Sequence, residues 1–513
     1  MEKLISLFII IPLASAFLIP IIGRLWNFFA KLLVPLVFLF LTILSIIFLL
    51  EVKDSSLTYE IGGWEPVKGI PIGIYFVIDG LSAFIVLIIN LIGFASSLYA
   101  TSYINKFTAE NNFFTLFCLM ATGMNGVVIT GDLFNLFVFL EISVISSYAL
   151  VAFGTEKEEL EASFKYQVLG GIASLLIVFG IGLLYWNTKT LNMADISRVI
   201  SQSGDQKILI FTQLIFVAGF GLKAAMIPFH AWLPDAHSSA PSPISAMLSG
   251  VLIKAIGIYC MLRIFINIFT ISYEIALVIT VIGTLSMIIG GLLAYGQKDI
   301  KRLLAYSSIS QMGYVMLSVG VGLMVITTGG SEMVARLCLF GGLFHLINHA
   351  VFKGLLFLNA GAIEYETGLR DLYQMGGLSQ KMKVTSGTSL VASLAISGLP
   401  PFNGFFSKII IIIAIIQAKF YILATLAVII SIVTLAYFMK LQKNAFYKKS
   451  VIDDMFKDIK EVPWSMSFSM IFLAVLCLVM SLLVIPDIRE AVVMPAVNSL
   501  LEGSEYTLTV FGN

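Results

Sequence analysis

Apolar segments of about 20 residues follow one another along nearly the whole chain, separated by short polar stretches. Each segment is long enough to cross the hydrocarbon core of a bilayer, which is about 30 Å thick. We therefore predict an all-α polytopic membrane protein with about fourteen transmembrane helices. The predicted spans are 4–23, 31–50, 73–99, 112–130, 132–153, 162–184, 207–227, 243–267, 273–294, 302–323, 336–360, 385–418, 419–443 and 465–486.

Two of these spans are interrupted by proline. The segments IPFHAWL (227–233) and LPPFNGFF (399–406) each place a Pro-Phe pair inside an apolar helix with a lysine nearby. The Pro- and His-rich region 228–242 is predicted to be an irregular second half of the seventh helix. Paired interruptions in two halves of a chain indicate an inverted repeat with the functional site at the midplane. The expected parts are spans 1–3 in 1–111, five-helix repeats in 112–267 and 273–443, and a loop with the last span in 444–513.

The composition agrees with this class of protein. Hydrophobic residues make up 59% of the chain and charged residues only 12%, which is far from the average of soluble proteins. No two cysteines have CxxC spacing, so we expect no disulfide, zinc or iron–sulfur site and no bound cofactor. The four cysteines are Cys118, Cys260, Cys338 and Cys477.

The distribution of Lys and Arg predicts the orientation. These residues are concentrated in the loops that follow odd-numbered spans, and cytoplasmic loops carry such an excess. We therefore expect a cell-membrane protein whose two termini both lie on the outer side. The cations of the odd-numbered loops are Arg24, Lys31, Lys106, Lys157, Lys298, Lys301, Arg302, Arg370, Lys381, Lys383, Lys440, Lys443, Lys448, Lys449, Lys457 and Lys460.

Several ionisable residues lie inside the predicted spans. A charged side chain at the centre of a bilayer costs roughly 3 kcal/mol on insertion scales, so such residues are usually kept for a task. A row of them beside broken helices is what a proton or ion pathway requires. The residues are Glu141, Lys223, Lys254, His345, Lys353 and Lys408.

Glu141 lies in the middle of the fifth predicted span, and Lys223 precedes the first break. One interpretation is that Glu141 only bonds a neighbouring helix. The other is an ion pair with Lys223, because an unpaired carboxylate at that depth would stay protonated. Such a pair can modulate proton transfer: the lysine is charged while the pair is closed and tends to release its proton when it opens.

Lys254 lies at the centre of the eighth predicted span, and Lys408 just after the second break. Lysine suits a proton relay because its surroundings can bring it close to losing its proton. The alternative is a snorkelling lysine that extends to the membrane surface. Lys254 is too deep for that interpretation, whereas it stays open for Lys408.

The segment FHLINHAVFKGLLF (344–357) places His345, His349 and Lys353 at i, i+4 and i+8 on one helical face. A metal site is the first alternative, but the glutamate of an HExxH motif is missing and no Asp or Glu lies within the predicted helix. Ordinary polar packing is the second. We favour a proton-conducting face without a metal.

His230, Asp235 and His237 lie in the irregular half-helix after the first break. They could form an access path to one membrane surface, or they could only cap and fix the broken backbone. The residues alone do not favour either interpretation.

Five long segments share a pattern with one known family. The segments are LFNLFVFLEISVISSYALVAFG (133–154), GLKAAMIPFHAWLPDAHSSAPSPISAMLSGVLIKAIGIY (221–259), GQKDIKRLLAYSSISQMGY (296–314), FHLINHAVFKGLLFLNAGAI (344–363) and SGLPPFNGFFSK (397–408). They resemble the antiporter-like subunits of respiratory complex I, of Mrp-type Na+/H+ antiporters and of membrane-bound group 4 hydrogenases. The segment 59–84 is more similar to the Mrp D-type subunit and its hydrogenase counterpart than to complex I.

The resemblance implies the broken seventh and twelfth helices, the inverted repeats and a set of transfer residues. The implied residues are Glu141, Lys223, Lys254, the stretch from His345 through Lys353, and Lys408. It further implies a subunit without redox chemistry of its own, which moves H+ or exchanges Na+ for H+ within an ion-pumping oxidoreductase or an antiporter. The implied partners are the lipid bilayer and other membrane subunits, further antiporter-like subunits among them, and we expect no nucleic-acid partner. The alternative function is a passive scaffold whose buried charges only hold the complex together.

Overall fold

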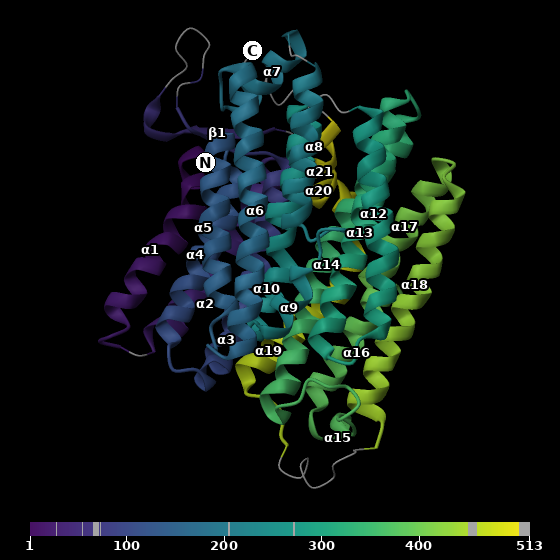
Figure 1. The fold of residues 1–513 in the computed structure, drawn as a ribbon. Coiled ribbons are helices and arrows are strands. Elements are labelled where there is room, and N and C mark those ends of the chain that lie inside the picture. The colour runs from purple at the N-terminus through teal and green to yellow at the C-terminus, as the bar shows by residue number, and fades with distance from the viewer. Residues whose placement is uncertain are drawn as a thin grey trace.

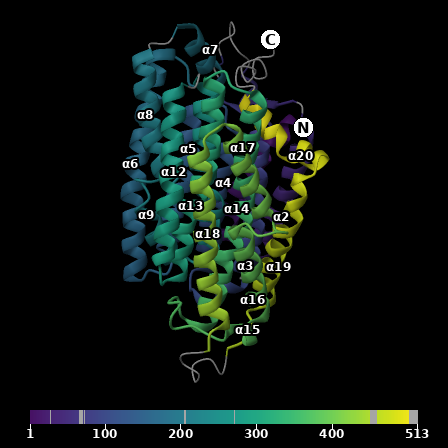
Figure 2. The same ribbon diagram turned by 90° about the vertical axis from the view of Figure 1, so that its right-hand side faces the viewer.

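The computed structural model describes residues 1–26, 28–53, 55–64, 71, 73–203, 206–269, 272–449 and 459–501. Twelve helices in this part of the chain are long and apolar enough to cross a membrane. They run side by side in one bundle, with α1 and α18 at opposite edges in Figure 1. Figure 2 shows α6 and α8 at one edge and α19 at the other. The prediction of an all-α polytopic membrane protein is confirmed.

The described chain consists of helices with two short strands near its N-terminus. The first part of the chain forms η1 (Glu2–Ser6), α1 (Leu7–Ile22), α2 (Phe29–Glu51), β1 (Leu57–Glu60), η2 (Ile61–Gly63), β2 (Tyr75–Ile78), α3 (Gly80–Tyr103), η3 (Ile104–Lys106), α4 (Glu110–Ile129), α5 (Leu133–Val151) and α6 (Lys157–Thr188). The middle part forms α7 (Met193–Ser203), α8 (Gln206–Lys223), α9 (Trp232–Ser239), α10 (Ser242–Met247), η4 (Leu248–Tyr259), α11 (Cys260–Leu262) and η5 (Arg263–Ile268). The last part forms α12 (Tyr273–Gly296), α13 (Ile300–Thr327), α14 (Glu332–Thr367), α15 (Leu378–Lys381), α16 (Lys383–Ser397), α17 (Asn403–Gln417), α18 (Tyr421–Gln442), η6 (Lys443–Tyr447), α19 (Trp464–Val479), η7 (Met480–Val484), α20 (Pro486–Val492) and α21 (Met494–Leu501). Met1 and α21 lie at one end of the bundle, which we call the terminal end, and α15 lies at the opposite end (Figure 1).

The third span begins later than the sequence predicts. Residues 75–78 form β2, which pairs antiparallel with β1 at the terminal end. The Asp79 side chain accepts a hydrogen bond from the Ser82 amide (2.9 Å), and the Ser82 hydroxyl accepts one from the Asp79 amide (2.8 Å). This reciprocal cap satisfies two free amides, so α3 begins at Gly80 rather than at residue 73.

Both predicted interruptions are present. Helix α8 ends at Lys223 and α9 begins at Trp232, with Pro228 between them. Two side chains bond the backbone around this break: Ser286 accepts from the Ile227 amide (3.0 Å), and the Trp232 indole donates to the Leu222 carbonyl (2.9 Å). Broken helices persist inside a membrane protein when neighbours satisfy the freed groups in this way. The second break separates α16 from α17.

The segment that follows α10 winds as a π-helix over η4 and again over η5. The hydrophobic pattern predicts an ordinary helix over 243–267, so this widened winding is a finding of the structure. Lys254 lies within η4, and Arg263 is the first residue of η5. The wide turns therefore carry both cations of this helical segment.

Arg263 forms a buried ion pair with Asp79 near the terminal end. Its two terminal nitrogens each lie 2.7 Å from an oxygen of the Asp79 carboxylate. Asn267 accepts from the same guanidinium (3.1 Å) and donates to the Ser499 carbonyl of α21 (2.8 Å). Burial raises the pKa of Asp79, but the Arg263 guanidinium and the helix cap outweigh it and hold that pKa below its ordinary value. The pair thus ties η5, α3 and α21 together.

We expect Asp79→Ala to destabilise the protein by about 3–5 kcal/mol, because it leaves a buried guanidinium without its partner. Thermal unfolding of the purified protein measures the loss, and the double variant Asp79→Ala with Arg263→Met should recover most of it. Because the folded pKa of Asp79 is lowered, this stabilisation is present above the unfolded pKa of about 4 and is lost as the pH falls further. Equal stability of the single and double variants would contradict the expectation.

Candidate ion-transfer site

Most of the ionisable residues predicted from the sequence lie in the interior of the bundle, whereas Glu141, His230 and Asp235 are only partly buried. Lys223, Lys254, Lys353 and Lys408 are each at most 3% exposed, and both His345 and His349 are fully buried. They come from α8, η4, α14 and α17, so the site extends through both predicted repeats. Their roles in ion transfer stay predictions.

Glu141 and Lys223 lie close together, with a serine between them. The Lys223 Nζ is 3.9 Å from the Glu141 Oε1, across the interface of α5 and α8. Lys223 donates to the hydroxyl of Ser174 on α6 (2.9 Å), and that hydroxyl donates to the Glu141 carboxylate. Lys223 also donates to the Gly170 carbonyl (3.0 Å). Ser174 can therefore keep Lys223 and Glu141 connected through its hydrogen bonds when the two charged groups move apart.

Lys254 has a different kind of environment. Its ammonium donates to the Ser249 and Gly250 carbonyls (2.5 and 2.6 Å), which belong to its own helical segment. In the part of the chain that the structure describes, no carboxylate forms an ion pair with it. The Ser249 hydroxyl shares a hydrogen bond with Ser308 of α13 (2.7 Å), which connects η4 to the second repeat. Lys254 is a buried cation held only by neutral oxygens.

The helix α14 presents its three predicted residues to different partners. His345 Nδ1 shares a hydrogen bond with Ser407 of α17 (2.9 Å), and its Nε2 with Gln311 of α13 (3.1 Å). Neither ring nitrogen of His349 has a hydrogen-bond partner among the described groups. Lys353 donates to the Leu304 carbonyl of α13 (2.7 Å). Within the described residues, no group of three His, Cys, Asp or Glu side chains is arranged to hold a metal ion.

Lys408 points into the bundle. It donates to the Ser431 hydroxyl of α18 (3.3 Å), and its Nζ lies 5.0 Å from the centre of the Tyr314 ring. The side chain is buried, so the snorkelling interpretation that the sequence left open is wrong. Its neighbours are again neutral groups.

The three residues after the first break have unlike surroundings. Asp235 forms ion pairs with Arg302 of α13 (2.5 Å) and Lys165 of α6 (3.1 Å), so it fixes the half-helix to its neighbours. His237 is fully buried, its ring stacks on Phe357 (4.6 Å between centroids), and neither of its nitrogens has a described partner. His230 is half-buried. The contacts of Asp235 agree with fixation of the broken backbone, whereas the role of His230 and His237 in an access path stays a prediction.

The comparison with known proteins now decides the family. Residues 130–434 match the family described as "NADH:quinone oxidoreductase/Mrp antiporter, TM". The chain belongs to this family.

Two relatives with curated names have similar sequences over most of their length. The NADH-quinone oxidoreductase N-type subunit of Desulforudis audaxviator is 35% identical over 77% of each chain. The Na(+)/H(+) antiporter D-type subunit of Alkalihalophilus pseudofirmus is 32% identical over 79% of each chain. The family therefore joins respiratory and antiporter subunits, as the sequence motifs predict.

Solved structures of antiporter-family complexes have the same fold. A chain of the Mrp complex from Dietzia sp. DQ12-45-1b superposes with a TM-score of 0.89, at 25% identity over 100% of this chain and 99% of that one. A chain of the membrane-bound sulfane sulfur reductase, an archaeal respiratory membrane complex, superposes with a TM-score of 0.86, at 30% identity over 99% and 100%. This antiporter-family chain is thus similar over its full length to subunits of multisubunit membrane complexes.

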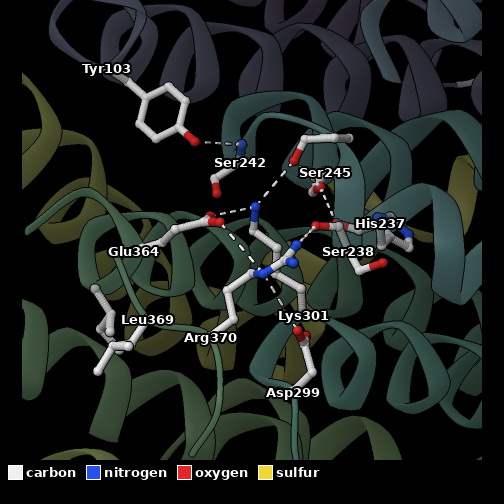
Figure 3. A network of polar contacts seen from close by, with 12 residues as sticks. Tyr103, His237, Ser238, Ser242, Ser245, Asp299, Lys301, Glu364, Leu369 and Arg370 are labelled. Carbon is white, nitrogen blue, oxygen red and sulfur yellow. Dashed lines mark hydrogen bonds and ion pairs between the residues drawn. The ribbon is translucent and has the colours of Figure 1, made fainter. Parts of the chain in front are cut away.

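Besides the pair of Asp79 and Arg263, the sequence did not predict the charged pair of Lys301 and Glu364 in this antiporter-family chain. Lys301 is assigned by the loop pattern to a loop, but it lies in the first turn of α13, is buried and contacts Glu364 at 2.6 Å (Figure 3). Helix α14 is longer at both ends than the predicted span, so it contains three glutamates, Glu332, Glu364 and Glu366, contrary to the expectation from the sequence. Asp299 was the sequence signal that Lys301 belongs to a helix. Its side chain accepts a hydrogen bond from the Arg302 amide (2.9 Å) and caps α13, which begins at Ile300.

Proposed function

We propose that this chain is an ion-translocating subunit of a multisubunit membrane complex, and that it moves protons or exchanges them for Na+. The observation that carries this proposal is the row of buried lysines, of which Lys223 and Lys408 lie beside helix breaks and Lys254 lies in a widened segment. Among the described residues, Lys254, Lys353 and Lys408 have only neutral oxygens as hydrogen-bond acceptors, which do not offset the cost of burying a fixed charge. Lysines in such surroundings can exchange protons, and a packing role does not require the charge.

The proposed transfer begins at Glu141 and Lys223. While the two groups are close, the carboxylate stabilises the ammonium. When they move apart, the ammonium is left in low-dielectric surroundings and releases its proton more readily. The released proton would pass through water and hydroxyl groups toward Lys254. The contact between Ser249 and Ser308 then connects η4 with α13, against which His345 and Lys353 of α14 are bonded.

The orientation is part of the proposal. Cations are concentrated near the α15 end, where Arg302, Arg370 and Lys381 lie, so we infer that this end faces the cytoplasm and that Met1 faces outward. Lys457, which the sequence analysis counted with them, lies outside the described residues. The repeats at 112–267 and 273–443 remain the proposed division of the chain, with a flanking segment on either side.

The proposed partners are other membrane subunits, further antiporter-like ones among them. We expect gentle purification from the native membrane to yield a complex that moves protons across proteoliposomes, with its subunits identified by mass spectrometry. Iron–sulfur subunits with nickel or flavin would make the chain the pump module of a redox complex. Small membrane partners without metal would make it part of an Mrp-type antiporter. A chain that purifies alone, and whose proteoliposomes show no proton movement, would contradict the proposal.

A further inference from the structure

A cluster of charged side chains lies where α13 and α14 meet near the α15 end (Figure 3). The Lys301 Nζ is 2.6 Å from a Glu364 oxygen. Arg370 follows α14, and its Nε lies 3.8 Å from the other Glu364 oxygen and 3.6 Å from the Asp299 carboxylate. We call Lys301, Glu364, Arg370 and Asp299 the inner cluster. None of its members belongs to the row of residues described above.

The members of the inner cluster range from partly exposed to buried. The Arg370 side chain is 31% exposed, that of Glu364 26% and that of Lys301 only 2%. Arg370 and Asp299 also line a surface hollow of about 290 Å³ between α6, α9 and α13. Exposure thus falls stepwise from the hollow, through Glu364, to the buried ammonium.

The inner cluster also reaches the buried His237. Lys301 donates to the Ala240 carbonyl (3.2 Å), and the Ser245 hydroxyl lies 3.5 Å from the same oxygen. Ser245 donates in turn to the His237 carbonyl (3.0 Å). These contacts connect Lys301 to the backbone of residues 237–240, at the end of α9. The charged groups that face this ring are Lys301 of α13, Lys353 of α14 and Lys254 of η4.

The ring nitrogens of His237 are free to bond water, but burial and the three lysines make a charged imidazolium costly, so the ring can hold a proton only briefly. Its two ring nitrogens are buried and have no hydrogen-bond partner among the described groups. A buried polar nitrogen without a protein partner usually bonds water or takes part in chemistry. Two of the three cations that face it, Lys254 and Lys353, belong to the proposed transfer row. One lysine of the inner cluster and two of the proposed row thus act electrostatically on the same ring.

We propose that Glu364 and Lys301 form the proton-loading site of the pathway at the α15 end, a role that rests on the proposed function. The Glu364 carboxylate takes a proton that enters from the hollow past Arg370 and becomes a neutral acid, which loosens its contact with Lys301. The Lys301 ammonium then gives a proton, through water, to a His237 ring nitrogen. The Glu364 acid returns a proton to the Lys301 amine. One proton has moved from the hollow to His237, and the ion pair is restored.

Other charged and titratable groups also face Glu364. They are Lys301, Arg370, Tyr99, Tyr103 and Lys106. Three of these are cations, so the Glu364 carboxylate lies among positive charges. A loading site of this kind controls the pH dependence of transport from one side of the membrane.

The test uses the whole complex in inside-out membrane vesicles, where the α15 end faces the outer buffer. Initial rates of proton uptake are measured over outer pH values from mildly acidic to mildly alkaline. We expect Glu364→Gln to slow uptake by at least about tenfold at alkaline pH and to flatten the pH profile, because an amide cannot take up the proton. The matched control is Glu366→Gln, the same change two residues along α14, which should leave rate and profile unchanged.

A second variant separates loading from folding. Glu364→Gln with Lys301→Met removes both charges and leaves no unpaired ion, so it should assemble even if the single variant does not. The same slow, flattened profile is expected. A normal profile in either assembled variant, or an equal loss in Glu366→Gln, would overturn the proposal. Lys223→Ala is measured in parallel, and normal transport by this variant would contradict the proposed function. Loss of transport in Lys223→Ala together with a normal profile in Glu364→Gln would contradict only the loading site.

Discussion

Lys223→Ala is expected to abolish ion movement while the complex still assembles. Transport should fall by at least about a hundredfold, since the variant lacks the amine that would take up and release the proton. Assembly should survive because Glu141, the partner left behind, has a 29% exposed side chain and is not sealed in the protein interior. Ser174 would still donate to it. The measurement is the initial rate of proton movement per amount of assembled complex.

The control for this variant is Lys189→Ala. Lys189 is exposed after the end of α6, and its Nζ lies over the Trp186 ring at 4.6 Å, away from the buried row. Its replacement removes the same charge and should leave the rate unchanged. Normal transport in an assembled Lys223→Ala complex would remove this lysine from the mechanism.

Lys254→Met is the second variant with a large expected effect, and it separates transport from a scaffold role. Both hydrogen bonds of the Lys254 ammonium go to carbonyls of its own helical segment. Removing them breaks no contact between helices, and methionine fills nearly the same volume without a charge. We expect normal assembly and a loss of transport of at least about a hundredfold.

Two measurements on the same membranes decide this second case. The amount of complex on a native gel reports assembly, and proton movement in vesicles reports transport. If the buried charges only held subunits together, Lys254→Met would reduce the amount of complex and leave the rate per complex unchanged. That result would favour the passive scaffold over the transporter.

The sequence predicts those features of the fold that depend on composition along one segment. Runs of apolar residues place Lys223 and Lys408 at bilayer depth, and the structure finds both buried. Proline cannot donate its backbone amide, so Pro228 marks the first break before any tertiary contact is known. The spacing from His345 to Lys353 likewise follows from the geometry of a single helix.

Features that depend on packing between distant segments are not predicted. Lys301 lies at the edge of an apolar run, where a residue can equally face water, and only the approach of α14 buries it against Glu364. Asp79 and Arg263 are far apart in the chain, and nothing in either segment indicates the other. The strands β1 and β2 are short, and an apolar stretch that forms a strand is not distinguished from the start of a helix by its pattern alone.

In the π-helical segment η4, the number of residues matters as much as which residues they are. A π-helix closes its turns at i+5 and so accommodates an additional residue, and in an α-helix one residue corresponds to a rotation of about 100°. The wide turns therefore set the relative direction of Lys254 and Arg263, which meet different neighbours. A relative with the same side chains but one residue fewer between Leu248 and Tyr259 would keep every functional group and point one of these two cations elsewhere. In this family, a gap in an alignment at this place would thus report on function as strongly as a substitution.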